Sequence, residues 1–368
     1  MSPHPNRREF AAISAGGLLL PGCTTLAPSR PATVPLAPAC LPRVHASSDR
    51  LIRAVACLRP YRASGFVVRA EPFGGKRLVH HYGHGGAGIT LSWGTARIAV
   101  DLALPGHSGA AAVLGAGVIG LTTARLLQEA GIPVTIYAAA LPPDTTSNLA
   151  GGQFHPYGFF REDSVTPEWR EQFRRATDYS WRRFQILVGE DYGVRWLPTY
   201  VESSAPEERP IPTYPPINRQ LARTEHPFPV DNIVLRQTLF IEPGRYLRQL
   251  LREFRTDGGN IRVVRFADSA ALAALPEGLI FNCTGLGARD LFGDSDLRPA
   301  RGQYAMLLPQ PEIQYAFTGR AGHMFPRPDG IYLGGTFELD EWSTEPRQAA
   351  IDRIIASHAR LFGALRCA

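Results

Sequence analysis

The stretch "AAAVLGAGVIGLTTARLLQEAGIPVTIY" occupies residues 110–137 and decides the fold. Apolar residues 111–114 predict a short strand, and a GxGxxG turn follows at 115–120. Apolar residues then recur at helical spacing until Gly131, and 133–137 predict a second strand. A GxGxxG in this strand–turn–helix–strand context is typical of a dinucleotide-binding α/β fold.

The three glycines of the turn have separate physical roles. Gly115 permits the tight turn, and Gly120 lets the helix pack closely on the strand. Gly117 lets the backbone approach a pyrophosphate at the start of the helix. The site therefore takes in the whole turn: Gly115, Ala116, Gly117, Val118, Ile119 and Gly120.

One expected residue is missing from this unit. An acidic residue normally ends the second strand and binds the adenosine ribose. Here the strand ends in Ala138, Ala139 and Ala140, and Asp144 lies several residues farther along. Other groups would then have to hold the ribose.

Length and composition narrow the class of protein. The 368 residues are 44% hydrophobic and 10% aromatic, as in a globular protein of one large or two ordinary domains. The net charge is +6, but no dense basic run with interleaved aromatic residues predicts nucleic-acid binding. No apolar run reaches the roughly 18 residues of a membrane-spanning helix. None of the five cysteines forms a CxxC pair, so we predict no metal site.

The N-terminus has the pattern of an address. Residues 6–23 read "NRREFAAISAGGLLLPGC", with Arg7 and Arg8 adjacent and a short apolar stretch before Cys23. The pattern resembles a twin-arginine export signal joined to a lipoprotein cleavage box, although Pro21 departs from the small residues of such boxes. It predicts export to the periplasmic side, with membrane contact only through a lipid on Cys23. The alternative is a disordered basic N-terminus.

The passage after the second strand indicates which dinucleotide binds. "PPDTTSNLAGGQFHPYG" (142–158) has small hydroxyl and amide residues before two glycines, which suits a loop against a ribityl chain and a flat ring. It resembles the D-amino-acid oxidase family of FAD enzymes, as do "FNCTGLGARDL" (281–291), "RGQ" (301–303) and "LGGTFELDEWS" (333–343). The resemblance implies FAD as cofactor. It also implies an α/β fold with a Rossmann-like three-layer FAD-binding domain and a substrate domain containing a large mixed β-sheet.

Two family landmarks stand ahead of the nucleotide motif. "LVHHYGHGGAGITLSWGTA" (78–96) fits the signature that closes the family's chains, and "CLRPYR" (57–62) resembles the Arg-Pro segment before it. We therefore expect a circular permutation in which "LALPGHSG" (102–109) joins the family's last segment to the nucleotide strand. The alternative is an unrelated module whose glycines mimic the signature.

The expected organisation follows from this order. The predicted segments are an export signal at 1–23, a Pro-rich tether at 24–49 and the permuted segment at 50–101. The FAD-binding domain is expected from 102–150 and 236–300, and the substrate domain from 151–235 and 301–368.

The resemblance implies further residues in contact with FAD. Gly83, His84, Gly85, Gly86, Ala87, Gly88, Ile89 and Thr90 would lie along the pyrimidine end of the flavin, where backbone dipoles favour the anionic reduced ring. The remaining predicted contacts are Thr145, Thr146, Ser147, Gly151, Gly152, Gln153, Thr284 and Gly285.

The resemblance also assigns the substrate site. Arg59 would bind the substrate carboxylate through its guanidinium fork, and the Gly86 carbonyl would accept from the substrate amine. The family's two tyrosines are missing: one position falls on His323 and the other near Gly319 or Arg320. His323 would either bind the carboxylate or be a loop histidine.

Two residues of the flavin-facing loop are further candidates. His155 takes the place of a family glutamine, and Tyr157 matches an aromatic residue. Each would either line the pocket or pack against the sheet.

The expected reaction is FAD-dependent oxidative deamination of a D-amino acid to the 2-oxo acid, with ammonia and hydrogen peroxide as products. The hydride goes to the flavin, so no side-chain base is strictly required, and molecular oxygen is the expected electron acceptor. One alternative is a dehydrogenase that passes electrons to a membrane acceptor. The other is a non-catalytic lipoprotein that binds flavin or another ligand.

Overall fold

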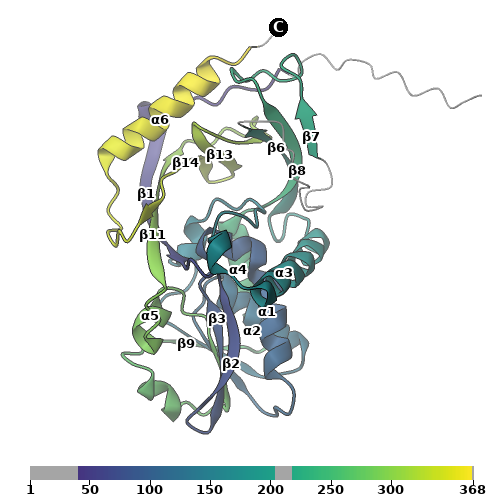
Figure 1. Cartoon of the computed structure of the whole chain (residues 1–368), viewed down its shortest axis with the longest axis vertical. Coiled ribbons are helices and arrows are strands. Elements are labelled where there is room, and N and C mark those ends of the chain that lie inside the picture. The colour runs from purple at the N-terminus through teal and green to yellow at the C-terminus, as the bar shows by residue number, and fades with distance from the viewer. Residues whose placement is uncertain (1–39, 204–217, 367–368) are drawn as a thin grey trace, which may run out of the picture. The chain divides into compact units, whose positions relative to one another are not determined.

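The computed structural model describes residues 40–203 and 218–366. The predicted export signal and Cys23 lie outside the described residues. The described chain forms a nine-stranded sheet and a six-stranded sheet, each with helices packed against it (Figure 1). No helix within these described ranges is both long enough and apolar enough to cross a membrane.

The six-stranded sheet contains the nucleotide motif. Its order is β2 (Val67–Phe73), β3 (Lys76–Tyr82), β10 (Leu279–Asn282), β4 (Ala111–Leu114), β5 (Val134–Ala138) and β9 (Asn260–Val263). All neighbours are parallel except β2 and β3. The helices beside it are α1 (Gly88–Ala103), α2 (Val118–Glu129), α4 (Pro243–Thr256) and the short α5 (Gly287–Phe292). The predicted strand–helix–strand unit is confirmed in β4, α2 and β5.

The turn between β4 and α2 explains two of its glycines. Gly115 has φ +104°, a conformation that side chains rarely adopt. A Cβ on Gly120 would stand 2.0 Å from the Gly115 carbonyl oxygen. Any larger residue at 120 would push α2 away from the turn.

The nine-stranded sheet is mixed, as expected. Its order is β1 (Leu51–Tyr61), β11 (Arg298–Leu307), β14 (Gly330–Gly334), β13 (Gly322–Arg327), β12 (Ala316–Gly319), β6 (Val194–Glu202), β8 (Ile233–Ile241) and β7 (Asn218–Leu221), with β15 (Glu338–Leu339) also paired to β11. Only β12 and β6 are parallel neighbours.

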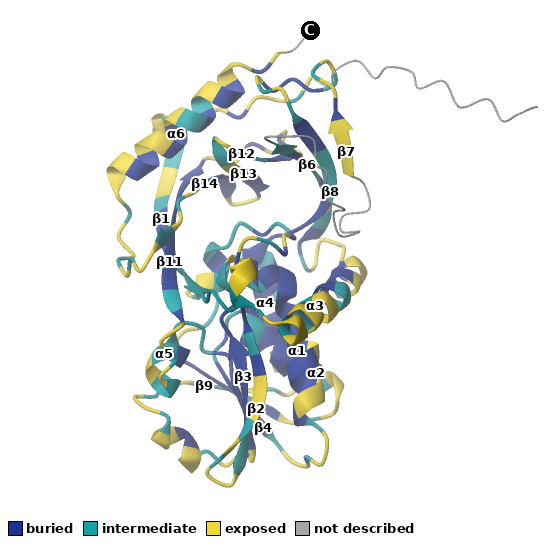
Figure 2. Ribbon diagram, in the orientation of Figure 1, coloured by how far each residue is buried: buried dark blue, intermediate teal, exposed yellow. Residues whose placement is uncertain are grey.

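Helix α6 (Gln348–Gly363) covers one face of this sheet over β11, β13 and β14. Figure 2 shows the division of α6 into a buried and an exposed side. The strand β11 alternates accordingly. Ala305 and Leu307 pack in the cluster with α6, whereas Tyr304 and Met306 pack on the opposite face.

The segment ahead of the nucleotide motif belongs to both sheets. β1 pairs antiparallel with β11, and Arg59 lies opposite Ala300. β3 pairs parallel with β10, which pairs in turn with β4. Residues 51–103 are therefore an integral part of the fold.

Two elements lie elsewhere than the predicted domain boundaries imply. β8, most of which was expected in the FAD-binding domain, is in the large sheet. Helix α3 (Pro167–Ile186), expected in the substrate domain, packs on α1 instead. A Cβ on Gly94 would stand 1.8 Å from the Ala176 carbonyl oxygen, and the Gly94 amide donates to Ser180 Oγ at 2.8 Å.

Part of the predicted tether, residues 42–46, packs against the rest of the protein. Val44 is 4% exposed and packs with residues of α6 and the large sheet. The Tyr315 hydroxyl donates to the Pro42 carbonyl at 2.8 Å, and the His45 amide donates to Gln310 Oε1 at 2.8 Å. Residues 42–46 thus belong to the folded unit, because their apolar side chains cover the sheet.

Candidate active site

A cavity of about 1000 Å³ is lined by residues from both sheets. The β4–α2 turn, the loop 144–158 and the turn after β10 supply one part of its wall. The loop between β3 and α1 and strands β1, β8, β11, β13 and β14 supply much of the rest. Motifs that lie more than 200 residues apart in the sequence therefore meet at one site.

The nucleotide end of the cavity is built on the start of α2. Residues 115–119 line it, and the first amides of a helix have no partners within the helix. The Val118 amide donates to Ser147 Oγ at 3.0 Å, and a Cβ on Gly117 would stand 3.1 Å from that oxygen. This bare backbone at a helix N-terminus fits the pyrophosphate of a dinucleotide.

Other predicted cofactor residues line the same cavity. They are Thr145, Thr146, Ser147, Gly151, Gly152, Gln153, Thr284, Gly285, Gly83, His84, Gly85, Gly86, Gly88 and Ile89. Ala139, Ala140 and Asp144 also line it, after the end of β5. The structure thus places one carboxylate, Asp144, in the cavity wall near the position of the missing ribose acid.

Three predicted contact residues lie behind the cavity wall rather than in it. Ala87 is buried in the core, and Gly120 packs against the turn. Thr90 Oγ1 accepts from the His155 amide at 2.9 Å, so it positions the flavin-facing loop instead of the cofactor itself. The motif predicted their neighbourhood correctly but not which residues face inward.

Arg59 lines the same cavity, together with Cys57, Leu58 and Pro60 of β1. Its Nη2 donates to the Thr336 carbonyl at 2.5 Å, and its Cζ lies 5.3 Å from the centre of the Phe337 ring. Its Nε is buried and has no hydrogen-bond partner. A Cβ on Gly86 would stand 3.7 Å from Arg59 Cδ, so the predicted carboxylate and amine sites are adjacent.

His155, Tyr157 and His323 all line the cavity. The side chains of His155 and His323 are exposed to the cavity, and desolvation by the surrounding walls is the main cause that lowers their pKa values. The pKa of His155 falls to about 4, with a smaller contribution from the charge of Arg236. The pKa of His323 also falls to about 4, with smaller contributions from His155 and Arg59. Both imidazoles are therefore neutral near pH 7.

The missing tyrosine pair has a counterpart on other strands. The rings of Tyr304 and Tyr332 lie 4.5 Å apart and line the cavity with Phe325. The Tyr304 hydroxyl contacts Cys57 Sγ at 3.0 Å. Arg320 pairs instead with Glu202, and neither Gly319 nor Arg320 lines the cavity.

The sequence analysis also missed two polar residues on β8. Arg236 and Thr238 line the cavity, two positions apart on the same face of the strand. No motif marks them. The available signal was strand alternation, which would have required the pairing of β8 in the large sheet to be known.

Comparison with known proteins agrees with this geometry. The DAO family, described as FAD dependent oxidoreductase, matches residues 14–102 and 110–368. A D-amino acid oxidase of Dugesia ryukyuensis is 30% identical over 247 residues, covering 64% of this chain and 72% of that protein. A D-amino-acid oxidase of Streptomyces coelicolor is 30% identical over 268 residues, covering 69% and 78%.

A solved structure shows the same fold. Glycine oxidase from Geobacillus kaustophilus superposes with a TM-score of 0.54 at 14% identity, over 70% of this chain and 80% of that one. The cofactor is FAD, and the alternative of a non-catalytic protein is excluded. The match to the family over most of the chain and the similarity to these relatives show that the chain belongs to the DAO family of FAD-dependent oxidoreductases.

Proposed function

We propose that the enzyme oxidises a D-amino acid to its 2-oxo acid, with release of ammonia and hydrogen peroxide. The observation that carries this proposal is the position of Arg59. Its side chain passes Gly86 at Cδ, in a cavity whose far end fits a dinucleotide, and its buried Nε has no partner. A buried N–H without a partner costs roughly 1–3 kcal/mol, and a substrate carboxylate would satisfy it.

The chain's residues would bind and orient the substrate. Arg59 binds the carboxylate, and the Gly86 carbonyl accepts from the amine. Two contacts on one substrate fix the direction of its Cα–H bond. FAD, when bound, accepts the hydride, and the aromatic wall of Tyr304, Phe325 and Tyr332 excludes water from the reacting carbon.

Anaerobic mixing tests the stereochemistry. Purified holoprotein is mixed with D- and L-forms of a panel of amino acids, and the absorbance of the oxidised flavin is followed. We expect loss of this absorbance with D-amino acids only. Reduction by L-amino acids alone, or by none of the panel, would contradict the proposal.

The electron acceptor is a separate question. Molecular oxygen is the proposed acceptor, and the N-terminal motif favours a membrane acceptor as the alternative. Turnover is compared in air and under argon with an artificial electron acceptor. Faster turnover with the artificial acceptor by an order of magnitude would support the dehydrogenase.

We also propose export through the motif at 6–23. The adjacent arginines and the short apolar stretch before Cys23 support it. Replacing Arg7 and Arg8 by Lys should leave holoprotein in the cytoplasm. Labelled palmitate should enter the wild type but not Cys23→Ala, if Cys23 is the lipid anchor.

Finally, we propose that the chain is a circular permutation of the family order. The order of the motifs supports this, since the Arg-Pro and glycine segments precede the nucleotide strand. The pairing of β1 with β11 and of β3 with β10 supports it too, because both strands are built into the two sheets.

A further inference from the structure

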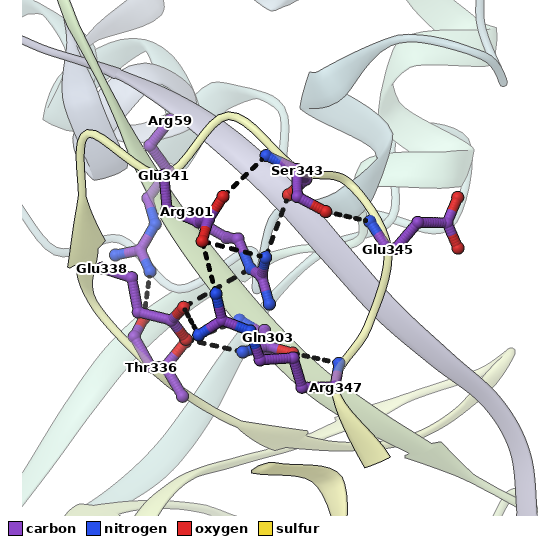
Figure 3. A network of polar contacts seen from close by, with 9 residues as sticks. All are labelled: Arg59, Arg301, Gln303, Thr336, Glu338, Glu341, Ser343, Glu345 and Arg347. Carbon is purple, nitrogen blue, oxygen red and sulfur yellow. Dashed lines mark hydrogen bonds and ion pairs between the residues drawn. The ribbon is translucent and has the colours of Figure 1, made fainter. Parts of the chain in front are cut away.

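A polar network lies on the face of β11 opposite the cavity (Figure 3). Side chains alternate along a strand, so Ala300 and Gly302 lie on the same face as Arg59, and Arg301 and Gln303 face the other way. Arg301 is 1% exposed and belongs to the motif "RGQ". Neither Arg301 nor Gln303, which face away from the cavity, takes part in the proposed reaction.

Opposite charges from the loop 336–347 surround Arg301. Its Nε lies 3.5 Å from Glu338 Oε2, and its Nη1 lies 3.7 Å from Glu341 Oε2. Arg347 pairs with the same two carboxylates. Gln303 Nε2 donates to Glu338 Oε1 at 2.6 Å, and Gln303 Oε1 accepts from the Arg347 amide at 2.7 Å. We call Arg301, Gln303, Glu338, Glu341 and Arg347 the clamp.

The clamp holds the residue on which Arg59 rests. The backbone amide of Gln303 donates to Thr336 Oγ1 at 3.1 Å. The Thr336 carbonyl accepts from Arg59 Nη2, and the next residue, Phe337, places its ring against the guanidinium. The hydroxyl of Thr336 thus contacts the backbone of β11, and its carbonyl contacts Arg59.

We propose that Thr336, fixed by the clamp, is a positioning residue that sets the orientation in which Arg59 meets the substrate carboxylate. An arginine side chain loses rotamer entropy when it is fixed. The Thr336 carbonyl already fixes Arg59 in the free enzyme. Less side-chain entropy is therefore lost when the carboxylate binds, and the affinity is higher. The inference rests on the proposed function for the identity of the ligand.

A matched pair of variants tests this role. Thr336→Val keeps the β-branched shape but cannot accept from the Gln303 amide, whereas Thr336→Ser keeps the hydroxyl. The probe is benzoate, a flat carboxylate suited to a cavity lined by Tyr304, Phe325 and Tyr332. Its dissociation constant is read from the change in flavin absorbance of the holoprotein, which does not require turnover.

We expect Thr336→Val to weaken benzoate binding 5- to 30-fold and Thr336→Ser to stay within threefold of the wild type. For a D-amino acid, KM should rise by a similar factor with kcat within twofold, because substrate and transition state lose the same interaction. Glu338→Gln keeps an acceptor for Gln303 but removes the charge that pairs with Arg301 and Arg347, and should weaken benzoate binding about threefold. Asp340→Asn is the control. Asp340 lies on the same loop, but its exposed ion pair with Arg298 is outside the clamp.

The outcomes separate this inference from the proposed function. Unchanged benzoate binding in Thr336→Val and Glu338→Gln, with binding lost in Arg59→Leu, would overturn the positioning role alone. Equal losses in Thr336→Val and Thr336→Ser would reduce it to a general packing effect and also overturn it. No benzoate response in the wild type, or an undiminished response in Arg59→Leu, would remove the carboxylate site and overturn both.

Discussion

Arg59 is the residue on which the assignment of substrate depends. Under the proposed function, replacing it by Leu would remove two charge-assisted hydrogen bonds to the substrate carboxylate, each worth roughly 1.5–3 kcal/mol. We expect kcat/KM for D-amino acids to fall about 100-fold or more, because each ~1.4 kcal/mol is a factor of ten. Flavin content should hardly change, because Arg59 contacts the substrate end of the cavity. Steady-state kinetics and the flavin-to-protein absorbance ratio check both points.

Two comparisons sharpen this measurement. Arg59→Lys should recover only part of the loss, because an ammonium lacks the planar fork. An amine substrate without a carboxylate should be affected much less by either change. Intact amino-acid kinetics in Arg59→Leu would mean that the carboxylate binds elsewhere.

Gly302 gives a second test at the same place. A Cβ there would stand 2.3 Å from Arg59 Nη2 and 2.7 Å from the Tyr304 hydroxyl, which are thus within about 5 Å of each other. Gly302→Ala should displace the guanidinium and raise KM for D-amino acids at least tenfold, without loss of flavin. Gly244→Ala is the matched control, since nothing lies within 4 Å of its added Cβ. Equal kinetics in the two variants would mean that Arg59 tolerates a shift.

At the scale of single residues, the sequence predicted those cavity residues that belong to motifs with a fixed spacing. Arg59, Gly86, Gly115 and Gly117 belong to short motifs, and the structure places them in one cavity. Tyr304 and Arg236 belong to no motif, and they face the cavity only because β11 and β8 pair with strands distant in the sequence. Long-range pairing decides which side of a strand is inward, and the local pattern does not contain it.

Among the elements, the strand–helix–strand unit was predictable because its hydrophobic periodicity and its glycines indicate the same element boundaries. The position of α3 was not predictable from the sequence. Its buried residues are Ala176, Thr177, Ser180, Trp181 and Phe184. This pattern marks a buried face, but it does not show which element the face meets. The contact depends on backbone approach at Gly94, which periodicity cannot show.

The crossing of α1 and α3 can be tested directly. A Cβ on Gly94 would overlap the Ala176 carbonyl at 1.8 Å, and a backbone atom cannot move aside as a flexible side chain can. Overpacking typically costs about 1–3 kcal/mol, so Gly94→Ala should lower Tm clearly and increase flavin loss on dilution. Gly363→Ala, at the open end of α6, should leave both unchanged. A Tm equal to the wild type in Gly94→Ala would show that the helices can separate at little cost.

The whole molecule should be sensitive to acid because it buries neutral histidines. Burial lowers the pKa of His84 to about 3 and that of His81 well below its ordinary value. The unfolded chain takes up these protons near pH 6.5, whereas the folded chain resists them. Stability is therefore fully present above about pH 6.5 and is lost as the pH falls, by roughly 1.4 kcal/mol per pH unit for each such histidine.

Urea denaturation of the holoprotein at several pH values between 7 and 4.5 measures this loss. His84 also contacts Thr95 Oγ1 at 3.0 Å, so His84→Gln should lower stability at pH 7 while making its decline with acid less steep. His45→Gln, at an exposed side chain, should leave the slope unchanged. A slope in His84→Gln as steep as in the wild type would assign the acid sensitivity to other groups.

The proposed permutation makes a prediction about the order of the chain, and the structure refines where the chain should be cut. Val44 and Ala46 pack in one cluster with Leu361, Phe362 and Leu365. Arg43 Nη2 donates to the Leu365 carbonyl at 3.2 Å, so the residues that follow α6 lie close to those that precede β1.

A chain that begins near residue 110 and carries residues 40–101 behind Ala368 should therefore fold and bind flavin at a ratio close to that of the native order. A second rearranged chain that carries only 50–101 should bind flavin but unfold at lower urea concentration, because it loses the burial of Val44 and Ala46. Failure of both rearranged chains to bind flavin, while the native order binds it, would show that these two stretches cannot be joined and that the family order is not recoverable from this chain.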